Sequence, residues 1–421
     1  MSTATDVWAR VMRKPAALPH PLGLDGLRGL AVVAVIGYHL DLTWTGGGFL
    51  GVEVFFTLSG FLITQLLVAE LARTGRVDVR AFAAARARRL VPALVACVLV
   101  TAVAVRLLLP DSAPGMRDDA LASLLYVQNW HLAVGGVPYT ETWTTPSPLL
   151  HLWSLAVEGQ LYVLWPALLV GVLAVTGRRR SALVALALAV ASAAAMALQY
   201  DPDSSGVAYY ATDSRASGFL VGAALALLWR PQLWSRRMPS AARAGLDLVG
   251  LAALAALLVE FVQISEFDDA LYEQGGFLRV GLLSAAVIAA ATRPRSLTGW
   301  LLGRKGMVWL GQRSYGIYLY HWPLFVLTHT VEDNPALDVL RVVATLLIAA
   351  ASYRWLELPI RRGLVRRVRA STGANAVLTA AAAGAVAVAV ATVVLTATSP
   401  ARLSGTPQAS PQPTEAAQAP A

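Results

Sequence analysis

The chain has 421 residues, of which 57% are hydrophobic and only 14% are charged, and its mean hydropathy is +0.58. A soluble domain usually carries nearer a quarter charged residues, so this composition favours a protein that lies mostly in lipid. The net charge of +9 comes from arginines in short loops between apolar runs, which indicates membrane topology rather than nucleic-acid binding. The single cysteine, Cys97, excludes an internal disulfide framework, and we expect neither a metal site nor a tightly bound cofactor.

Apolar runs of about 17–25 residues are long enough to cross a bilayer as helices. Such runs predict an all-α, polytopic membrane protein. The polar first twenty residues do not have the pattern of a cleavable signal peptide, so the first span would serve as its own signal. The predicted spans lie at about 25–43, 48–69, 90–109, 149–176, 181–199, 215–229, 245–264, 277–292, 307–329, 337–358 and 375–397.

The loops between these spans alternate in charge. One set is rich in arginine, as at 178–180, and the other is acidic, as at 265–276. The positive-inside rule then predicts a cytoplasmic N-terminus and, with eleven spans, an extracytoplasmic C-terminus. The residues from 399 onward are mostly Pro, Ala, Gln, Ser and Thr, which cannot build a core. We therefore expect a cytoplasmic segment at 1–21, a membrane domain at 22–365, a basic linker with the eleventh helix at 366–398 and a disordered tail at 399–421.

The first span carries two ionisable residues on one face. Arg28 and His39 are eleven residues apart, which is nearly three helical turns and about 16 Å along the helix axis. Ionisable groups are costly inside a membrane and usually serve a function there. An anionic substrate bound by Arg28 could place its reactive group near His39. The alternative is a structural histidine bonded to a neighbouring helix.

The second span and the loop after it add further charges. Glu53 could orient a histidine or act as a base, and a structural ion pair is the alternative. Arg86, Arg88 and Arg89 follow at the predicted cytoplasmic surface. They either anchor the topology or bind phosphate, because the fork of a guanidinium matches phosphate oxygens.

The fourth span begins with a polar stripe formed by His151, Ser154, Glu158 and Tyr162. Residues at this spacing share one helix face and project from it in parallel. A proton relay within the single helix is therefore not expected. The stripe either forms one wall of a site or packs against another helix.

Three other regions carry candidate residues. Tyr318 and His321 lie on one face of the ninth span, and Arg215 stands at the head of the sixth, where it could line a cavity. Arg354 and Glu357 in the tenth span are expected to form a structural ion pair.

The chain has no glycine-rich nucleotide loop, metal-ligand cluster or nucleophile elbow. Its membrane spans instead hold three histidines, several carboxylates and clustered arginines. This set suits general-base acyl transfer from a donor that carries phosphate. It equally suits a proton-coupled transporter.

The motifs resemble those of the acyltransferase-3 family of integral membrane acyltransferases. Arg28 with ten residues before His39 looks like the signature of the family's first helix. GVEVFFTLSGFLIT, the arginine cluster, HLWSLAVEGQLYVLWP, SYGIYLYHWPL and WLELP follow in the family's order. The resemblance covers about residues 22–365.

This resemblance implies a ten-helix bundle in a bacterial cytoplasmic membrane. It implies transfer of an acyl group, often acetyl, from cytoplasmic acyl-CoA to a hydroxyl of a cell-envelope carbohydrate or glycolipid. A macrolide or another secondary metabolite is the alternative acceptor. Some relatives continue after an eleventh helix into an extracytoplasmic esterase-like domain, whereas a short Pro-rich tail follows here. We therefore expect the chain to act alone or to pass its acyl group to a separate extracytoplasmic protein.

The resemblance also implies roles for individual residues. Arg28 and His39 match the family's essential pair, and the arginine cluster extends to donor binding. His39 is expected to deprotonate the acceptor hydroxyl, oriented by Glu53 or Glu158. The remaining expected substrate-binding residues are His151, Ser154, Tyr162, Arg215, Tyr318 and His321.

Overall fold

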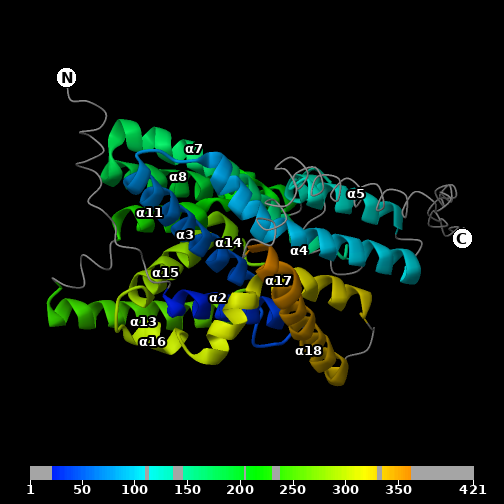
Figure 1. Ribbon diagram of the computed structural model, residues 1–421. Helices are drawn as coiled ribbons and strands as arrows, with labels where there is room; N and C mark the ends of the chain where they lie inside the picture. The colour runs from blue at the N-terminus through cyan, green and yellow to red at the C-terminus, as the bar shows by residue number, and fades with distance from the viewer. Residues whose placement is uncertain are drawn as a thin grey trace, which may run out of the picture.

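A computed structural model describes residues 21–109, 113–135, 146–202, 205–229, 238–329 and 334–361 (Figure 1). The described part of the chain is helical and contains no strand. The N-terminal segment before residue 21, the predicted eleventh helix at 375–397 and the predicted tail at 399–421 lie outside the described residues, so these expectations stay predictions.

Each of the first ten predicted spans corresponds to a helix. Within the described residues, seven helical stretches are long and apolar enough to cross a membrane, and two more apolar helices, α11 and α15, are shorter. The chain is therefore an all-α, multi-pass membrane protein. The ten helices are α2 (Leu22–His39), α3 (Gly51–Thr74), α4 (Val79–Leu108), α7 (Trp153–Thr176), α8 (Arg178–Gln199), α11 (Ser217–Leu228), α13 (Ser240–Gln263), α15 (Gly276–Ala291), α17 (Lys305–Leu327) and α18 (Pro335–Ser352).

Short helical segments connect these ten helices. The sixth predicted span, 215–229, corresponds to α11, which has only 12 residues, and two short helices separated by extended backbone at Ala211 (ψ 143°) precede it. At 1.5 Å per residue, α11 is about 18 Å long, which is less than the roughly 30 Å of a bilayer core. The connecting segments are η1 (Gly48–Leu50), α5 (Ala113–Leu124), α6 (Gln128–Val134), η4 (Leu150–Leu152), α9 (Gly206–Tyr210), α10 (Thr212–Arg215), α14 (Asp269–Glu273), α16 (Leu297–Leu302), the π-helical η5 (Tyr353–Glu357) and α19 (Leu358–Arg361).

Two helix pairs form the centre of the bundle, α2 with α17 and α3 with α11 (Figure 1). Glycines allow α3 and α11 to approach closely. A Cβ atom at Gly222 would lie 2.0 Å from the carbonyl oxygen of Thr57, and Gly218 stands one turn earlier on α11. Small residues four apart are typical of tightly packed membrane helices. This packing fixes α3, which carries several of the candidate site residues.

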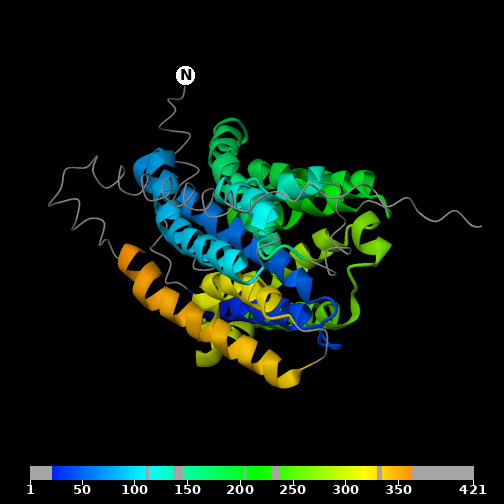
Figure 2. The same cartoon turned by 90° about the vertical axis from the view of Figure 1, so that its right-hand side faces the viewer.

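Helix α18 lies at the outside of the bundle in both views (Figures 1 and 2). Only 11% of the span Pro335–Arg361 is buried inside the protein. Its exposed side chains are large and apolar, including Val339, Leu340 and Leu347. A helix with an apolar exposed face is expected to contact lipid.

The expected ion pair between Arg354 and Glu357 is wrong. Arg354 is exposed, whereas Glu357 is buried and interacts electrostatically with Arg361 and Arg89. The pairing assumed α-helical geometry, in which residues three apart share a face. The chain forms a π-helical turn over Tyr353–Glu357, so the regular α-helical spacing that the pairing assumed does not hold there.

Candidate active site

Three cavities follow one another through the bundle. We call the largest, of about 1190 Å³, the wide cavity. It lies where α2 ends, and its lining includes Asp41, Ser147, Glu266, His329 and Arg341. Asp41 and His329 are exposed, so the wide cavity opens to the surface. The loops that line it belong to the set that the charge pattern predicts to be extracytoplasmic.

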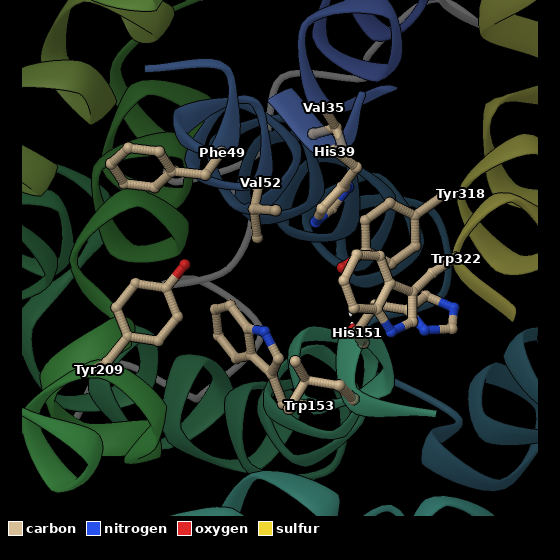
Figure 3. A pocket seen from close by; sticks show the side chains of 10 residues that line it. Val35, His39, Phe49, Val52, His151, Trp153, Tyr209, Tyr318 and Trp322 are labelled. Carbon is tan, nitrogen blue, oxygen red and sulfur yellow. Dashed lines mark hydrogen bonds between the residues drawn. The ribbon is translucent and has the colours of Figure 1, made fainter. Parts of the chain in front are cut away.

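The second cavity, which we call the aromatic pocket, holds only about 20 Å³ and has room for about one water molecule. Figure 3 shows His39 and Tyr318 on one side of this space and Trp153 and Tyr209 across from them. His39 and Trp322 line both the aromatic pocket and the wide cavity. The His39 ring therefore stands at the boundary between the surface-connected cavity and the interior.

The third cavity, which we call the arginine pocket, has a volume of about 50 Å³. Its polar lining includes Arg28, Ser59, Glu158 and Ser314. Val52 and Tyr318 line both this pocket and the aromatic pocket, so the two side chains separate them. Three cavities thus form a broken path from Arg28 to the wide cavity.

The three membrane histidines lie together beside the aromatic pocket, which His39 and His151 line, although they come from three separate parts of the sequence. His39 is the last residue of α2, which ends four residues before the predicted boundary at 43. Its Nδ1 atom lies 3.0 Å from Nε2 of His321 on α17. The rings of His151 and His321 are 5.6 Å apart. Within the described chain, no group of His, Cys, Asp and Glu has the arrangement of a metal site.

Hydroxyl groups hold this cluster in place. Tyr318 donates a hydrogen bond of 2.9 Å to the carbonyl oxygen of His151, and its hydroxyl lies 2.7 Å from that of Ser154. The Nε2 atom of His151 lies 3.1 Å from the carbonyl oxygen of Leu319. These contacts join α7 to α17. Ser154 and Tyr318 therefore support the histidines, and both also line the arginine pocket.

Arg28 lies at the other end of the path. Its Nε atom donates a hydrogen bond of 3.2 Å to Ser314, and its guanidinium lies 5.7 Å from the centre of the Phe55 ring. Glu158 is nearby and interacts with Arg28 electrostatically. The carboxylate of Glu158 accepts hydrogen bonds from Ser59 and Tyr162. The structure thus gathers one cation, one carboxylate and several hydroxyls from four helices.

The arginine cluster on α4 only partly joins this group. Arg86 and Arg89 are partly buried, and both interact electrostatically with residues of the arginine pocket or its surroundings: Arg89 with Arg28, and Arg86 with Glu158. Arg88 is exposed on the same helix. The cluster therefore forms a positive region beside the arginine pocket, on the face that the sequence predicts to be cytoplasmic.

Glu53 and Arg215 pair with each other. Their side chains are fully buried, and the ion pair measures 3.5 Å between Arg215 Nη2 and Glu53 Oε2. The Arg215 guanidinium also lies 3.9 Å from the centre of the Phe277 ring. Hence the described side-chain contacts of Glu53 are with Arg215 and Ser217, and those of Glu158 include Ser59 and Tyr162. The expected partnership of either carboxylate with His39 stays a prediction.

The sequence of residues 22–355 matches the family described as "Acyltransferase domain". The chain belongs to the acyltransferase-3 family. It is 41% identical over 82% of its length to YrhL of Bacillus subtilis, which is named provisionally as a peptidoglycan O-acetyltransferase. It is 39% identical over 80% of its length to the peptidoglycan O-acetyltransferase OatA of Listeria monocytogenes. It is also 34% identical over 83% of its length to the O-acetyltransferase OatA of Staphylococcus aureus.

The chain spans little more than half the length of these relatives: 56% of YrhL, 55% of the Listeria protein and 58% of the Staphylococcus protein. No solved structure matches it significantly. Family membership therefore rests on the sequence match, which covers the whole path from Arg28 to the wide cavity.

Four aromatic residues that line the aromatic pocket of this acyltransferase-3 protein were not among the expected site residues. They are Phe49, Trp153, Tyr209 and Trp322, and the Trp322 ring lies 4.6 Å from that of His39. The two tryptophans could have been predicted from the sequence as site residues, because each lies within two residues of a candidate histidine. Tyr209 gave no such signal, because the short helix α9 that carries it has no apolar periodicity.

Proposed function

We propose that this acyltransferase-3 protein transfers an acyl group, in particular acetyl, from cytoplasmic acyl-CoA to a hydroxyl of a cell-envelope carbohydrate or glycolipid. The observation that carries the proposal is the position of His39 at the boundary between the wide cavity and the interior path. A base at this boundary can meet an acceptor from one side and a donor from the other. The names of both OatA relatives agree with O-acetyl transfer, and that of the Listeria protein also names peptidoglycan.

The proposed donor side is the positive region around Arg86, Arg88 and Arg89. The CoA phosphates would bind these guanidinium groups, which can form paired, charge-assisted hydrogen bonds with phosphate oxygens. The acyl-pantetheine arm would then extend past Arg28 toward His39. Arg28 supports this path because it lines the arginine pocket and interacts electrostatically with Arg89.

The proposed acceptor side is the wide cavity. Its volume of about 1190 Å³ exceeds the roughly 300–1,000 Å³ of most small-molecule pockets, so it can hold more than one sugar ring. Its lining combines the aromatic side chains of Tyr38 and Trp322 with the polar side chains of Asp41 and Asn334. Aromatic faces beside hydrogen-bonding groups suit the apolar faces and hydroxyls of a sugar.

The chemistry proposed for His39 is general-base catalysis. The acceptor oxygen attacks the thioester carbonyl carbon while His39 removes the hydroxyl proton. The carbon–sulfur bond then breaks, and the proton passes from His39 to the departing sulfur, which leaves as the thiol. A positioned base of this kind typically contributes about 10²–10⁴-fold in rate.

The test uses purified protein in liposomes with radiolabelled acetyl-CoA and soluble peptidoglycan strands as the acceptor. His39→Gln keeps approximate size and hydrogen bonding but cannot act as a base, so we expect acetyl transfer to fall by at least about 10²-fold. The matched control is His131→Gln, a half-exposed histidine on α6, which should transfer normally. Near-normal transfer by well-folded His39→Gln protein would contradict the proposal.

A further inference from the structure

Trp322 forms part of the wall between the wide cavity and the aromatic pocket. Within the described chain, these two cavities share two lining residues, His39 and Trp322. The two rings lie against each other, with 4.6 Å between their centres and 51° between their planes. Figure 3 shows both on the same side of the aromatic pocket. The two rings therefore divide a cavity that opens to the surface from a pocket inside the protein.

The indole ring of Trp322 is held in this position. Only 5% of the residue is exposed, and among its contacts is a hydrogen bond of 2.9 Å from Nε1–H to the carbonyl oxygen of Ser147. The Ser147 hydroxyl in turn donates to the carboxylate of Asp119, which also accepts a hydrogen bond of 2.9 Å from Gln128. Movement of a buried ring away from such a partner leaves its N–H unpaired, which is costly. The wall is therefore anchored at Trp322.

The two sides of the wall differ in their access to water. The wide cavity, of about 1190 Å³, connects with the surface and admits bulk water. The aromatic pocket, of about 20 Å³, has room for about one water molecule, and most of its lining is apolar or aromatic. A thioester bound on the pocket side of Trp322 would thus lie next to bulk water but be separated from it by one ring.

Water competes with the acceptor for the acyl group. In hydrolysis the oxygen of water bonds to the thioester carbonyl carbon and the carbon–sulfur bond breaks. His39 passes one proton of the water to the sulfur, and the second proton leaves with the acetic acid. A base that activates a sugar hydroxyl can also activate water, which is present in large excess. The basicity of His39 alone therefore does not favour transfer over hydrolysis, whereas exclusion of water from the thioester does.

We propose that Trp322 determines whether the acyl group reaches a sugar hydroxyl or water. Its indole ring keeps the water of the wide cavity away from a thioester bound in the aromatic pocket. An acceptor sugar bound against the cavity side of the ring presents one hydroxyl at His39 and occupies the remaining opening. This inference rests on the proposed function, because it assumes that an acyl thioester reaches His39 from the interior.

The test measures where the acetyl group goes. Protein in liposomes receives radiolabelled acetyl-CoA and soluble peptidoglycan strands, and labelled acetate is counted beside labelled strands. We expect the wild-type protein to release little acetate, with or without the strands. Trp322→Leu keeps an apolar side chain but vacates more space than the roughly 30 Å³ that one water molecule occupies in the liquid. Labelled acetate should therefore rise several-fold in this variant while labelled strands decrease.

Two further variants serve as controls. Trp309 lies on the same helix, α17, but is 38% exposed and is not among the described lining residues of the three cavities. Trp309→Leu should therefore give the wild-type ratio of acetate to strands. The double variant Trp322→Leu/His39→Gln should release about 10²-fold less acetate than Trp322→Leu, because the water that enters still needs the base.

An unchanged ratio of acetate to strands in folded Trp322→Leu protein overturns the inference, because a merely structural role would lower both products together. Acetate release that persists in the double variant also overturns it, since water would then react away from His39. If Trp322→Leu does not fold, Trp322→Phe decides the point: it has one ring fewer and no N–H, so a wild-type ratio there overturns the inference as well. The proposed function fails by a different result, namely normal labelling of the strands by His39→Gln.

Discussion

The buried pair of Glu53 and Arg215 gives a stability prediction that can be worked out from the structure. Glu53→Gln keeps the shape of the side chain and removes its charge. Arg215 is then left with no exposed surface and without the carboxylate that lies 3.5 Å away. Removal of one partner of a buried pair typically costs about 3–5 kcal/mol, because the other charge stays buried and uncompensated. The Phe277 ring beside Arg215 is present in both proteins, so it does not change this difference.

The double variant Glu53→Gln/Arg215→Met separates the charge from the packing. It removes both charges and keeps most of the side-chain volume. Replacement of a whole buried pair by apolar groups is often neutral or stabilising, so we expect the double variant to regain most of the lost stability. A single variant that is less stable than the double variant would be the signature of a structural ion pair.

The assay can use Cys97, which is the only cysteine in the sequence and is buried in α4. A thiol-reactive fluorogenic dye reports thermal unfolding in detergent when it reaches Cys97. An unfolding entropy of about 2.1 cal/mol/K per residue gives about 1 °C per kcal/mol for a chain of 421 residues, so Glu53→Gln should lower the midpoint by roughly 3–6 °C. An unchanged midpoint would refute the reasoning. A stable double variant that no longer transfers acyl groups would instead return Glu53 to the catalytic group.

Three other predictions test the path, the wide cavity and the topology. Val52→Phe places a larger side chain between the arginine and aromatic pockets and should abolish transfer while acyl-CoA binding persists; retained transfer would exclude this path. Burial raises the pKa of the Glu266 carboxyl. The folded protein therefore binds a proton at Glu266 more readily than the unfolded protein does. As a result, the wild-type protein loses stability as the pH rises through the pKa that Glu266 has in the folded state. The Glu266→Gln variant should therefore have a higher melting midpoint than the wild-type protein at pH 7. This difference should disappear below about pH 4, near the ordinary pKa of a glutamate. A difference between the two midpoints that does not change with pH would be inconsistent with this reasoning. A reporter active only in the cytoplasm, fused after residue 400, should stay silent, and an active fusion would show that the predicted span count is wrong.

The sequence was sufficient to locate the ten helices between 22 and 361, because each apolar run is close to the length that a bilayer requires. The predicted start of the sixth span at 215 lies within two residues of Ser217, where α11 begins. The sequence did not predict the short helices α9 and α10 before it, or the extended backbone between them at Ala211, which has no proline beside it.

The contacts between helices were beyond the sequence pattern. Periodicity places His39 and His321 on faces of their own helices, but it does not show that residues 282 positions apart meet. The same holds for Glu53 and Arg215, which lie on α3 and α10. The error at Arg354 had another origin, since no residue pattern there indicates that the α-helix widens into a π-helical turn.

The position of His39 has a further consequence for energy coupling. In the proposed reaction the donor approaches from one side of the membrane and the acceptor from the other, so an acyl group moves outward across the layer at His39. The acceptor proton returns through His39 to the sulfur, in the opposite direction. An acyl group exchanged for a proton moves no net charge. The membrane voltage, which acts with about 2.3 kcal/mol per elementary charge per 100 mV, would therefore neither drive nor oppose the transfer, and acylation would proceed equally in energised and de-energised cells.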